Sequence, residues 1–243
     1  MSAAAQSPVV RLKGQVMKWT ETIKRRLGKL RRSNGVEAAR FVPATENVHG
    51  VDLWDCAVFT SSMISVTSEL SMASQFARLR ASQGNEYRNQ LPRDASASVC
   101  TLAYPVPQSF AEGPLFKASE MEDKWDVYFF DPHIYFVRSW SGQLIYRATV
   151  RFEDQHMAIT GIECAGGHAS EFGRRTVDYL VKSHVLGAVA LHPLPDTLPA
   201  DPMQVAVSSF ATFGRRCAYG TYVDTTVLPW TTASGHQAGR SAV

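Results

Sequence analysis

The sequence predicts an α+β fold, in which an antiparallel β-meander is packed by helices and preceded by a basic amphipathic helix. Between residues 125 and 164, aromatic and β-branched segments alternate with turn signals, which is typical of a meander. On both sides of this region, apolar residues recur at helical spacing. The chain is 45% hydrophobic and 19% charged, which is the composition of an ordinary globular protein.

Residues 1–35 are expected to form a basic helical arm. The apolar residues are three or four positions apart, which places them on one face of a helix, and Asn34-Gly35 provides a stop signal. The predicted apolar stripe consists of Leu12, Val16, Trp19, Ile23, Leu27 and Leu30.

Positive charge is concentrated in this arm. Residues 11–32 carry nine basic side chains and one acidic side chain, and because the whole chain has a net charge of +3, the remainder is net −5. Such a segment suits an anionic membrane surface, a groove on a protein partner, or the acidic remainder of the chain itself. Nucleic acid is less favoured, because Trp19 in the apolar stripe suits an interface better than a phosphate backbone. The basic residues assigned to the attachment surface are Lys24, Arg25, Arg26, Arg31 and Arg32.

Residues 36–120 are expected to form a mixed helical and irregular segment that covers the sheet. The periodicity of residues 53–59 fits either a strand or a helix, whereas residues 68–83 read as a helix that ends near Gly84. A short extended stretch at 99–104 and a proline-containing loop follow.

Residues 121–187 are expected to hold the meander and one helix, over residues 170–186. Residues 188–230 then form a proline-rich linker, a short helix from about 203 that Asp201-Pro202 begins, and a strand near 219–228. A disordered tail is predicted for 231–243. The predicted strands are 125–130, 133–140, 143–152 and 157–164, with turns at Asp131-Pro132 and Ser141-Gly142.

A two-residue turn at Ser141-Gly142 would pair Trp140 with Gln143 and Arg138 with Ile145. This register divides the side chains into a core face and a second face that is rich in tryptophan and arginine. The predicted core face is Tyr135, Val137, Leu144, Tyr146, Ala148 and Val150; the second face is Phe136, Arg138, Trp140, Ile145, Arg147 and Arg151.

The second face is the candidate ligand or partner surface. If the turn at Asp131-Pro132 also has two residues, Trp125 lies opposite Arg138 and joins it. The guanidinium of arginine can donate two hydrogen bonds to a phosphate, and the ring of tryptophan can stack on a base, so the face suits an anionic, nucleotide-like ligand. Tryptophan and arginine also often anchor protein interfaces, so the face equally suits a protein partner. Alternatively, residues 36–120 cover it. The candidate residues are Trp125, Arg138, Trp140, Arg147 and Arg151.

The meander also resembles a domain that recurs in uncharacterised bacterial proteins. The resemblance covers roughly residues 120–187 and implies a loose association with ADP-ribose and nucleotide metabolism, without any catalytic residue. The residues that carry it are Trp125, Tyr128, Ile134-Tyr135-Phe136, Arg138-Ser139-Trp140-Ser141-Gly142 and Leu144-Ile145-Tyr146.

Motifs for several enzyme classes are missing from the sequence. It contains no phosphate-binding loop, no dinucleotide glycine fingerprint, no metalloprotease motif and no Cys-x-x-Cys pair, so we expect neither a cofactor nor a metal. The four cysteines are far apart and are expected to be reduced, mostly buried thiols. Without an apolar N-terminal run or a membrane span, the expected location is cytoplasmic, with peripheral membrane contact as an addition.

These patterns favour a non-enzymatic interaction or adaptor protein that its basic helix attaches to a membrane surface or protein partner. The alternative is a ligand-binding or enzymatic domain for an anionic, nucleotide-like compound, such as one related to ADP-ribose, with the Arg/Trp face as its binding site. The sequence determines neither the partner nor the oligomeric state.

Overall fold

A computed structural model describes residues 37–106, 108–166, 171–231 and 237–238. The chain divides into two units, residues 1–37 and residues 38–243, and the described helices and strands all belong to the second. The predicted basic helix therefore lies outside the described residues. The α+β class is confirmed, because the described part of the chain contains four α-helices and three sheets, which are mostly antiparallel.

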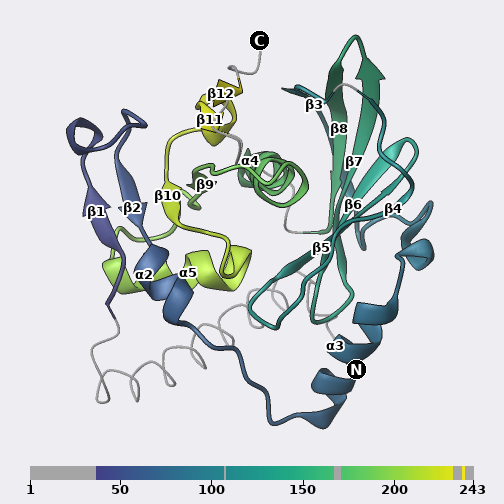
Figure 1. The fold of residues 1–243 in the computed structure, drawn as a ribbon, viewed down its shortest axis with the longest axis horizontal. Coiled ribbons are helices and arrows are strands. Elements are labelled where there is room, and N and C mark those ends of the chain that lie inside the picture. The colour runs from purple at the N-terminus through teal and green to yellow at the C-terminus, as the bar shows by residue number, and fades with distance from the viewer. Residues whose placement is uncertain (1–36, 107, 167–170, 232–236, 239–243) are drawn as a thin grey trace, which may run out of the picture. The chain divides into compact units, whose positions relative to one another are not determined.

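The larger sheet has six antiparallel strands in the order β3-β8-β7-β6-β5-β4, whereas the sequence predicted four strands and a short extended stretch at 99–104 (Figure 1). Two of its strands lie in the segment that was expected to cover the sheet, one at each edge. The strands are β3 (Ser96–Tyr104), β4 (Gly113–Phe116), β5 (Trp125–Phe130), β6 (His133–Arg138), β7 (Leu144–Glu153) and β8 (His156–Cys164).

The two predicted turns have different outcomes. Phe130 pairs with His133, so the two-residue turn at Asp131-Pro132 is confirmed. The prediction of a two-residue turn at Ser141-Gly142 is wrong. The backbone N–H of Arg138 donates to the carbonyl of Gln143, so the loop between the two strands has four residues, 139–142. A register shift at Ile145 follows, so that β6 and β7 finally pair one position away from the predicted register. A shift of one residue exchanges the two faces of a strand.

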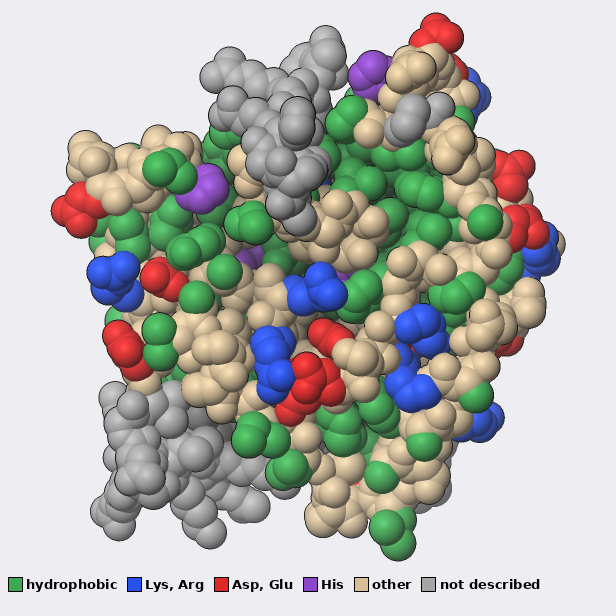
Figure 2. Space-filling model, viewed as in Figure 1, with side chains coloured by type: hydrophobic (Ala, Val, Ile, Leu, Met, Phe, Trp, Pro, Cys, Tyr) green, Lys and Arg blue, Asp and Glu red, His purple; other side chains and the backbone are tan. Residues whose placement is uncertain are grey.

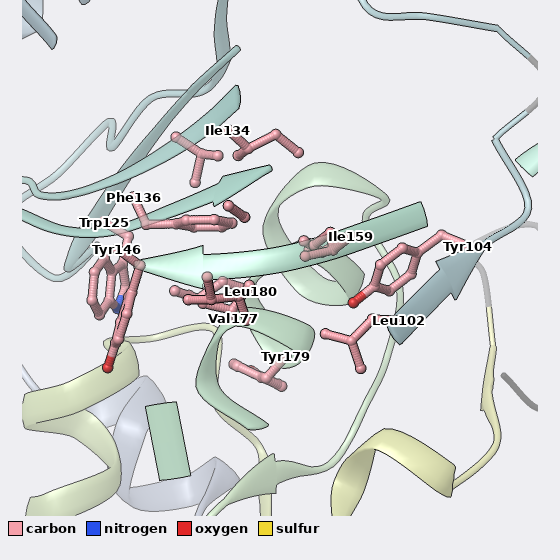
Figure 3. Packing of buried hydrophobic residues seen from close by; sticks show 14 of the residues in the cluster. Leu102, Tyr104, Trp125, Ile134, Phe136, Tyr146, Ile159, Val177, Tyr179 and Leu180 are labelled. Atoms are coloured by element: carbon pink, nitrogen blue, oxygen red, sulfur yellow. The ribbon is translucent and has the colours of Figure 1, made fainter. Parts of the chain in front are cut away.

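Both faces of the meander are buried. One face packs beneath α4 (Glu171–Leu180) and the π-helix η3 (Val181–Val185), which confirms the expected cover for Tyr146, Ala148 and Val150. Figure 3 shows Trp125, Phe136 and Tyr146 of this face, with Val177 and Leu180 of α4 close by. The other three predicted members of this core, Tyr135, Val137 and Leu144, instead pack on the opposite face with Tyr87, Tyr128 and Phe130.

The opposite face is covered by α3 (Leu70–Ala81) and the 3₁₀ turn η2 (Asn85–Tyr87). The helix expected over 68–83 is thus confirmed. Arg80 in its last turn donates two hydrogen bonds, of 2.9 and 2.5 Å, to the carboxylate of Asp126, which is 1% exposed. Because an unpaired charge at a buried position is costly, this bidentate pair fixes α3 to the sheet.

A second, smaller sheet has the order β1-β2-β10-β9, and α4 lies between the two sheets in Figure 1. The segment 53–59, which the sequence left open as strand or helix, contains both: its first three residues form strand β2, and helix α2 begins at Ala57. Of the strand expected at 219–228, only residues 219–221 are extended, and a separate 3₁₀ turn follows at 225–227. The remaining elements are β1 (Arg40–Val42), η1 (Ala44–Glu46), β2 (Leu53–Asp55), α2 (Ala57–Ser62), β9 (His192–Pro193), α5 (Pro202–Phe213), β10 (Tyr219–Thr221), η4 (Thr225–Val227), β11 (Trp230–Thr231) and β12 (Gln237–Ala238).

Candidate functional site

Trp125 and Arg138 of the candidate face lie opposite each other, as predicted. The structure places both of them at the C-terminal end of α5. They pair across β5 and β6, and the guanidinium carbon of Arg138 is 4.8 Å from the centroid of the Trp125 ring. The indole N–H of Trp125 donates to the carbonyl of Thr212 over 2.7 Å. Arg138 donates to the carbonyls of Ala211 and Thr212, each over 2.9 Å. These carbonyls lie in the last turn of α5 and carry the partial negative charge of the helix C-terminus. Trp125 and Arg138 therefore cap α5, and their donor groups point at the helix rather than into solvent.

Arg138 stays charged in this position. Burial lowers the pKa of its guanidinium to about 10, which is still well above neutral pH. Two of its donor nitrogens are bonded to helix carbonyls, and Trp125 is only 2% exposed. The two residues therefore join the large sheet to α5 and leave little of either side chain for a ligand.

Arg147 and Arg151 do not join them. Arg147 pairs with Tyr135 on the opposite face of the sheet, where its guanidinium forms a 2.8 Å ion pair with Glu163. Arg151 is exposed. The expectation that these arginines share one face with Trp125 and Arg138 is wrong, because the one-residue shift in β7 turns them to the other side.

Trp140 lies beyond the end of β6 and remains at the surface, half-buried. Its indole N–H donates to the carbonyl of Met121 over 2.7 Å, and its ring is 6.3 Å from that of Phe76 in α3. Trp140 also lines a hollow of about 210 Å³ between the first turns of α3 and the β6–β7 loop. The other lining residues are Glu69, Ser71, Met72, Gln75 and Ser141.

Lys124 is a member of this region that sequence reasoning missed. Its ammonium nitrogen is 5.1 Å from the centroid of the Trp140 ring and 4.7 Å from that of Phe210, and it donates to Ser65 over 2.9 Å. Burial, followed by the nearby Arg138 charge, lowers the pKa of Lys124 to about 8. A single lysine before a strand gives no sequence signal for this position, because its partners come from three distant segments.

We call residues 63–70 the apolar strap; they comprise the segment that joins α2 to α3 and the first residue of α3, Leu70. Its inner side is fixed by polar contacts: the backbone N–H of Ser65 donates to Glu122 over 2.6 Å, and Arg215 donates to the carbonyl of Met63 over 3.3 Å. Its outer side carries three aliphatic side chains, Ile64, Val66 and Leu70, which are 74%, 76% and 84% exposed. Figure 2 shows hydrophobic side chains along the lower edge of the molecule, where Figure 1 draws this segment.

The strap and the hollow are adjacent, since Leu70 lies between two of the residues that line the hollow, Glu69 and Ser71. Together they form a surface of aliphatic side chains beside an aromatic residue, with a carboxylate, hydroxyls and an amide at the margin. Exposed aliphatic groups beside tryptophan and methionine are typical of protein interfaces. This surface is suited to binding rather than to proton or group transfer.

A serine and a histidine lie within hydrogen-bonding distance elsewhere in the fold. The hydroxyl of Ser209 is 2.8 Å from Nε2 of His192, and the two residues are 1% and 0% exposed. Burial lowers the pKa of His192 to about 3. A substrate has no access to a pair that is enclosed in this way, so the pair supports the packing of α5 against β9.

The cysteines behave as predicted. All four are free thiols, three of them are buried, and burial raises the pKa of Cys56 to about 11. Among the described residues, no group of three His, Cys, Asp or Glu side chains is placed to hold a metal ion. Within the same part of the chain, no helix combines the length and the apolarity that crossing a bilayer requires.

Comparison of the chain with protein-family models, with curated proteins and with solved structures finds no match.

Proposed function

We propose that this chain is a non-enzymatic interaction protein that attaches to an anionic membrane surface through its basic segment, residues 11–32. The observation that carries the proposal is the charge distribution: nine basic side chains and one acidic side chain lie in this segment, while the rest of the chain is net negative. The predicted apolar stripe would enter the headgroup region and the basic side chains would meet anionic lipid. Each basic residue near the surface contributes about 1 kcal/mol.

The apolar strap supports an interaction role for the folded body as well. Ile64, Val66 and Leu70 are held outward on a segment whose inner side is bonded to Glu122 and Arg215. The hollow beside Trp140 would accept one apolar side chain of a protein partner. We therefore infer an adaptor arrangement, with one segment for the membrane and one surface for a protein.

The nucleotide-ligand alternative has less support from the contacts of its residues. A phosphate group would need the donors of Arg138, but two of them are bonded to Ala211 and Thr212. An aromatic plane for a base would need Trp125, which is buried. Trp140, the other candidate tryptophan, lines a surface hollow.

The test is co-sedimentation of the full chain with vesicles of phosphatidylcholine, with and without phosphatidylserine. We expect binding only when phosphatidylserine is present, and expect it to weaken as salt is added, because salt screens exposed charges. The triple variant Lys24→Glu, Arg25→Glu, Arg26→Glu should lose the binding.

The matched control makes the same change of charge on the folded body, at the exposed residues Arg78, Arg93 and Arg151. This triple arginine-to-glutamate variant should bind the vesicles nearly as well as the unchanged chain. Equal loss in both triple variants would mean that net charge alone matters, and the assignment to residues 11–32 would be wrong. If the unchanged chain does not bind at all, a protein partner replaces the membrane as the target.

A further inference from the structure

The outward face of α3 carries no charge over most of its length. The helix has no charged residue from Leu70 to Ala77, whereas a helix on the surface of a soluble protein usually turns charged side chains to the solvent. Its inward side contacts the body through Phe76, whose ring is 6.3 Å from that of Trp140, and through Leu79, which is 6% exposed. The exposed residues of the outward face are Leu70, Ala73, Ser74, Ala77 and Ala81. The face therefore extends the exposed apolar surface of the strap along the helix.

Opposite charges lie at the two ends of this face. Glu69 is the N-cap residue of α3 and Arg78 is in its last turn, and both are exposed. Glu69 lines the hollow together with Gln75, and Gln75 and Arg78 are three positions apart on the same side of the helix. The two charges therefore lie along one side of the face. Within the part of the chain that the structure describes, neither Glu69 nor Arg78 has an ion-pair partner.

We infer that the protein partner of this surface is a second copy of the chain, with α3 of the two copies paired in antiparallel orientation across a two-fold axis. The inference rests on the binding role proposed for the apolar strap and is independent of membrane attachment. An axis between Ala73 and Ser74 brings Glu69 of each copy opposite Arg78 of the other. Parallel helices would instead bring like charges together, so the charges select the antiparallel orientation.

The same axis places Leu70 of each copy opposite Ala77 of the other, where the small side chain leaves room for it. Small residues at the centre of the contact let the two helix axes approach to the lower end of the usual range of about 8–10 Å. The contact is nevertheless weak, because two helices of three turns bury less surface than a standard interface of about 1,600 Å². The association should therefore depend on concentration.

The test measures molar mass by sedimentation equilibrium of the full chain, from about 1 µM to about 1 mM, the range in which a weak interface dissociates. We expect the mass to rise from one copy to two. Ala77→Lys should keep the mass at one copy throughout, because the lysine takes the space of Leu70 and adds a charge to an uncharged contact. The matched control is Ala200→Lys, at an exposed position next to the start of α5, which should leave the dissociation constant unchanged.

A charge exchange tests the orientation. Arg78→Glu should raise the dissociation constant roughly tenfold, because like charges would then lie together at both ends of the contact. The double variant Glu69→Arg, Arg78→Glu restores opposite charges across the axis and should return the dissociation constant close to its original value. A double variant as weak as Arg78→Glu alone would overturn the antiparallel pairing.

Two further readouts keep this inference separate from folding and from membrane attachment. Circular dichroism should show that every variant keeps the fold, and Ala77→Lys should still co-sediment with phosphatidylserine vesicles. Vesicle binding lost in a chain that still forms dimers would count against membrane attachment alone. A chain that stays at one copy throughout, a dimer that survives Ala77→Lys, or equal weakening by Ala200→Lys would overturn the pairing through α3.

Discussion

At the residue scale, Gly84 occupies a position where the fold leaves no room for a side chain. This glycine has φ +83°, and a Cβ atom at this position would lie 2.2 Å from Cδ1 of Tyr128. Tyr128 is fully buried in the meander, and its ring centroid is 5.5 Å from that of Tyr87 in η2. The sequence identifies Gly84 as a helix stop, whereas the contact with an aromatic ring 44 positions away follows only from the tertiary structure.

We expect Gly84→Ala to lower the free energy of unfolding by about 2–4 kcal/mol, because it combines a left-handed backbone with an overpacked contact. Gly50→Ala is the control, since Gly50 has φ +66° but nothing within 4 Å of a Cβ atom. Its cost should be that of the backbone alone, about 1–2 kcal/mol. Urea unfolding of both variants measures the difference, and equal costs would show that Tyr128 moves aside.

At the element scale, α5 and the β6–β7 hairpin show when local sequence is sufficient. Asp201-Pro202 predicts the start of α5, and the carboxylate of Asp201 does accept the N–H of Gln204 over 2.9 Å. The cap and the helix lie within four residues, so no distant contact is needed. The hairpin differs, because Ser141-Gly142 fits either a two-residue or a four-residue loop.

For α5 we expect Asp201→Ala to lower the free energy of unfolding by about 1 kcal/mol, through loss of the cap. Asp201→Asn keeps an acceptor oxygen and should cost much less. Thermal unfolding of the two variants separates the cap from the charge. If Asn is as costly as Ala, the contribution of Asp201 is the interaction of its charge with the helix rather than the hydrogen bond.

At the scale of the whole molecule, two histidines are enclosed without charge. His184 contacts the Phe116 ring at the β4 edge, and His192 lies against Phe213 of α5. Burial lowers the pKa of each histidine from 6.5 to about 3. Below pH 6.5 the unfolded chain therefore binds more protons than the folded chain, and the folded state loses stability as the pH falls.

Each histidine should remove about 2 kcal/mol of stability between pH 7 and pH 5. Urea unfolding at the two pH values tests this, and His184→Gln should reduce the decline by about that amount. His156→Gln, at an exposed position, is the control and should leave the decline unchanged. A decline of the same size in all three proteins would place the acid sensitivity elsewhere.

The residues of the candidate site that the sequence locates correctly are those whose contacts are local in the chain. Trp125 and Arg138 were placed together correctly, because Asp131-Pro132 fixes a short turn. Arg147 was placed on the wrong face, because the longer loop and the register shift at Ile145 changed the pairing by one residue. Lys124 and the apolar strap were missed, since they depend on contacts between segments about 60 residues apart.

The sequence by itself determined the α+β class, helix α3, the start of α5, the first hairpin turn and the location of positive charge. These depend on periodicity, caps and composition, all of which act over a few residues. Only the tertiary structure decided which face each arginine occupies, that both faces of the meander are buried, and that Ile64, Val66 and Leu70 are left in solvent. Whether a residue is buried depends on which elements pack on its segment, and the elements that cover the meander lie before it in the chain, in α3 and η2, and after it, in α4 and η3.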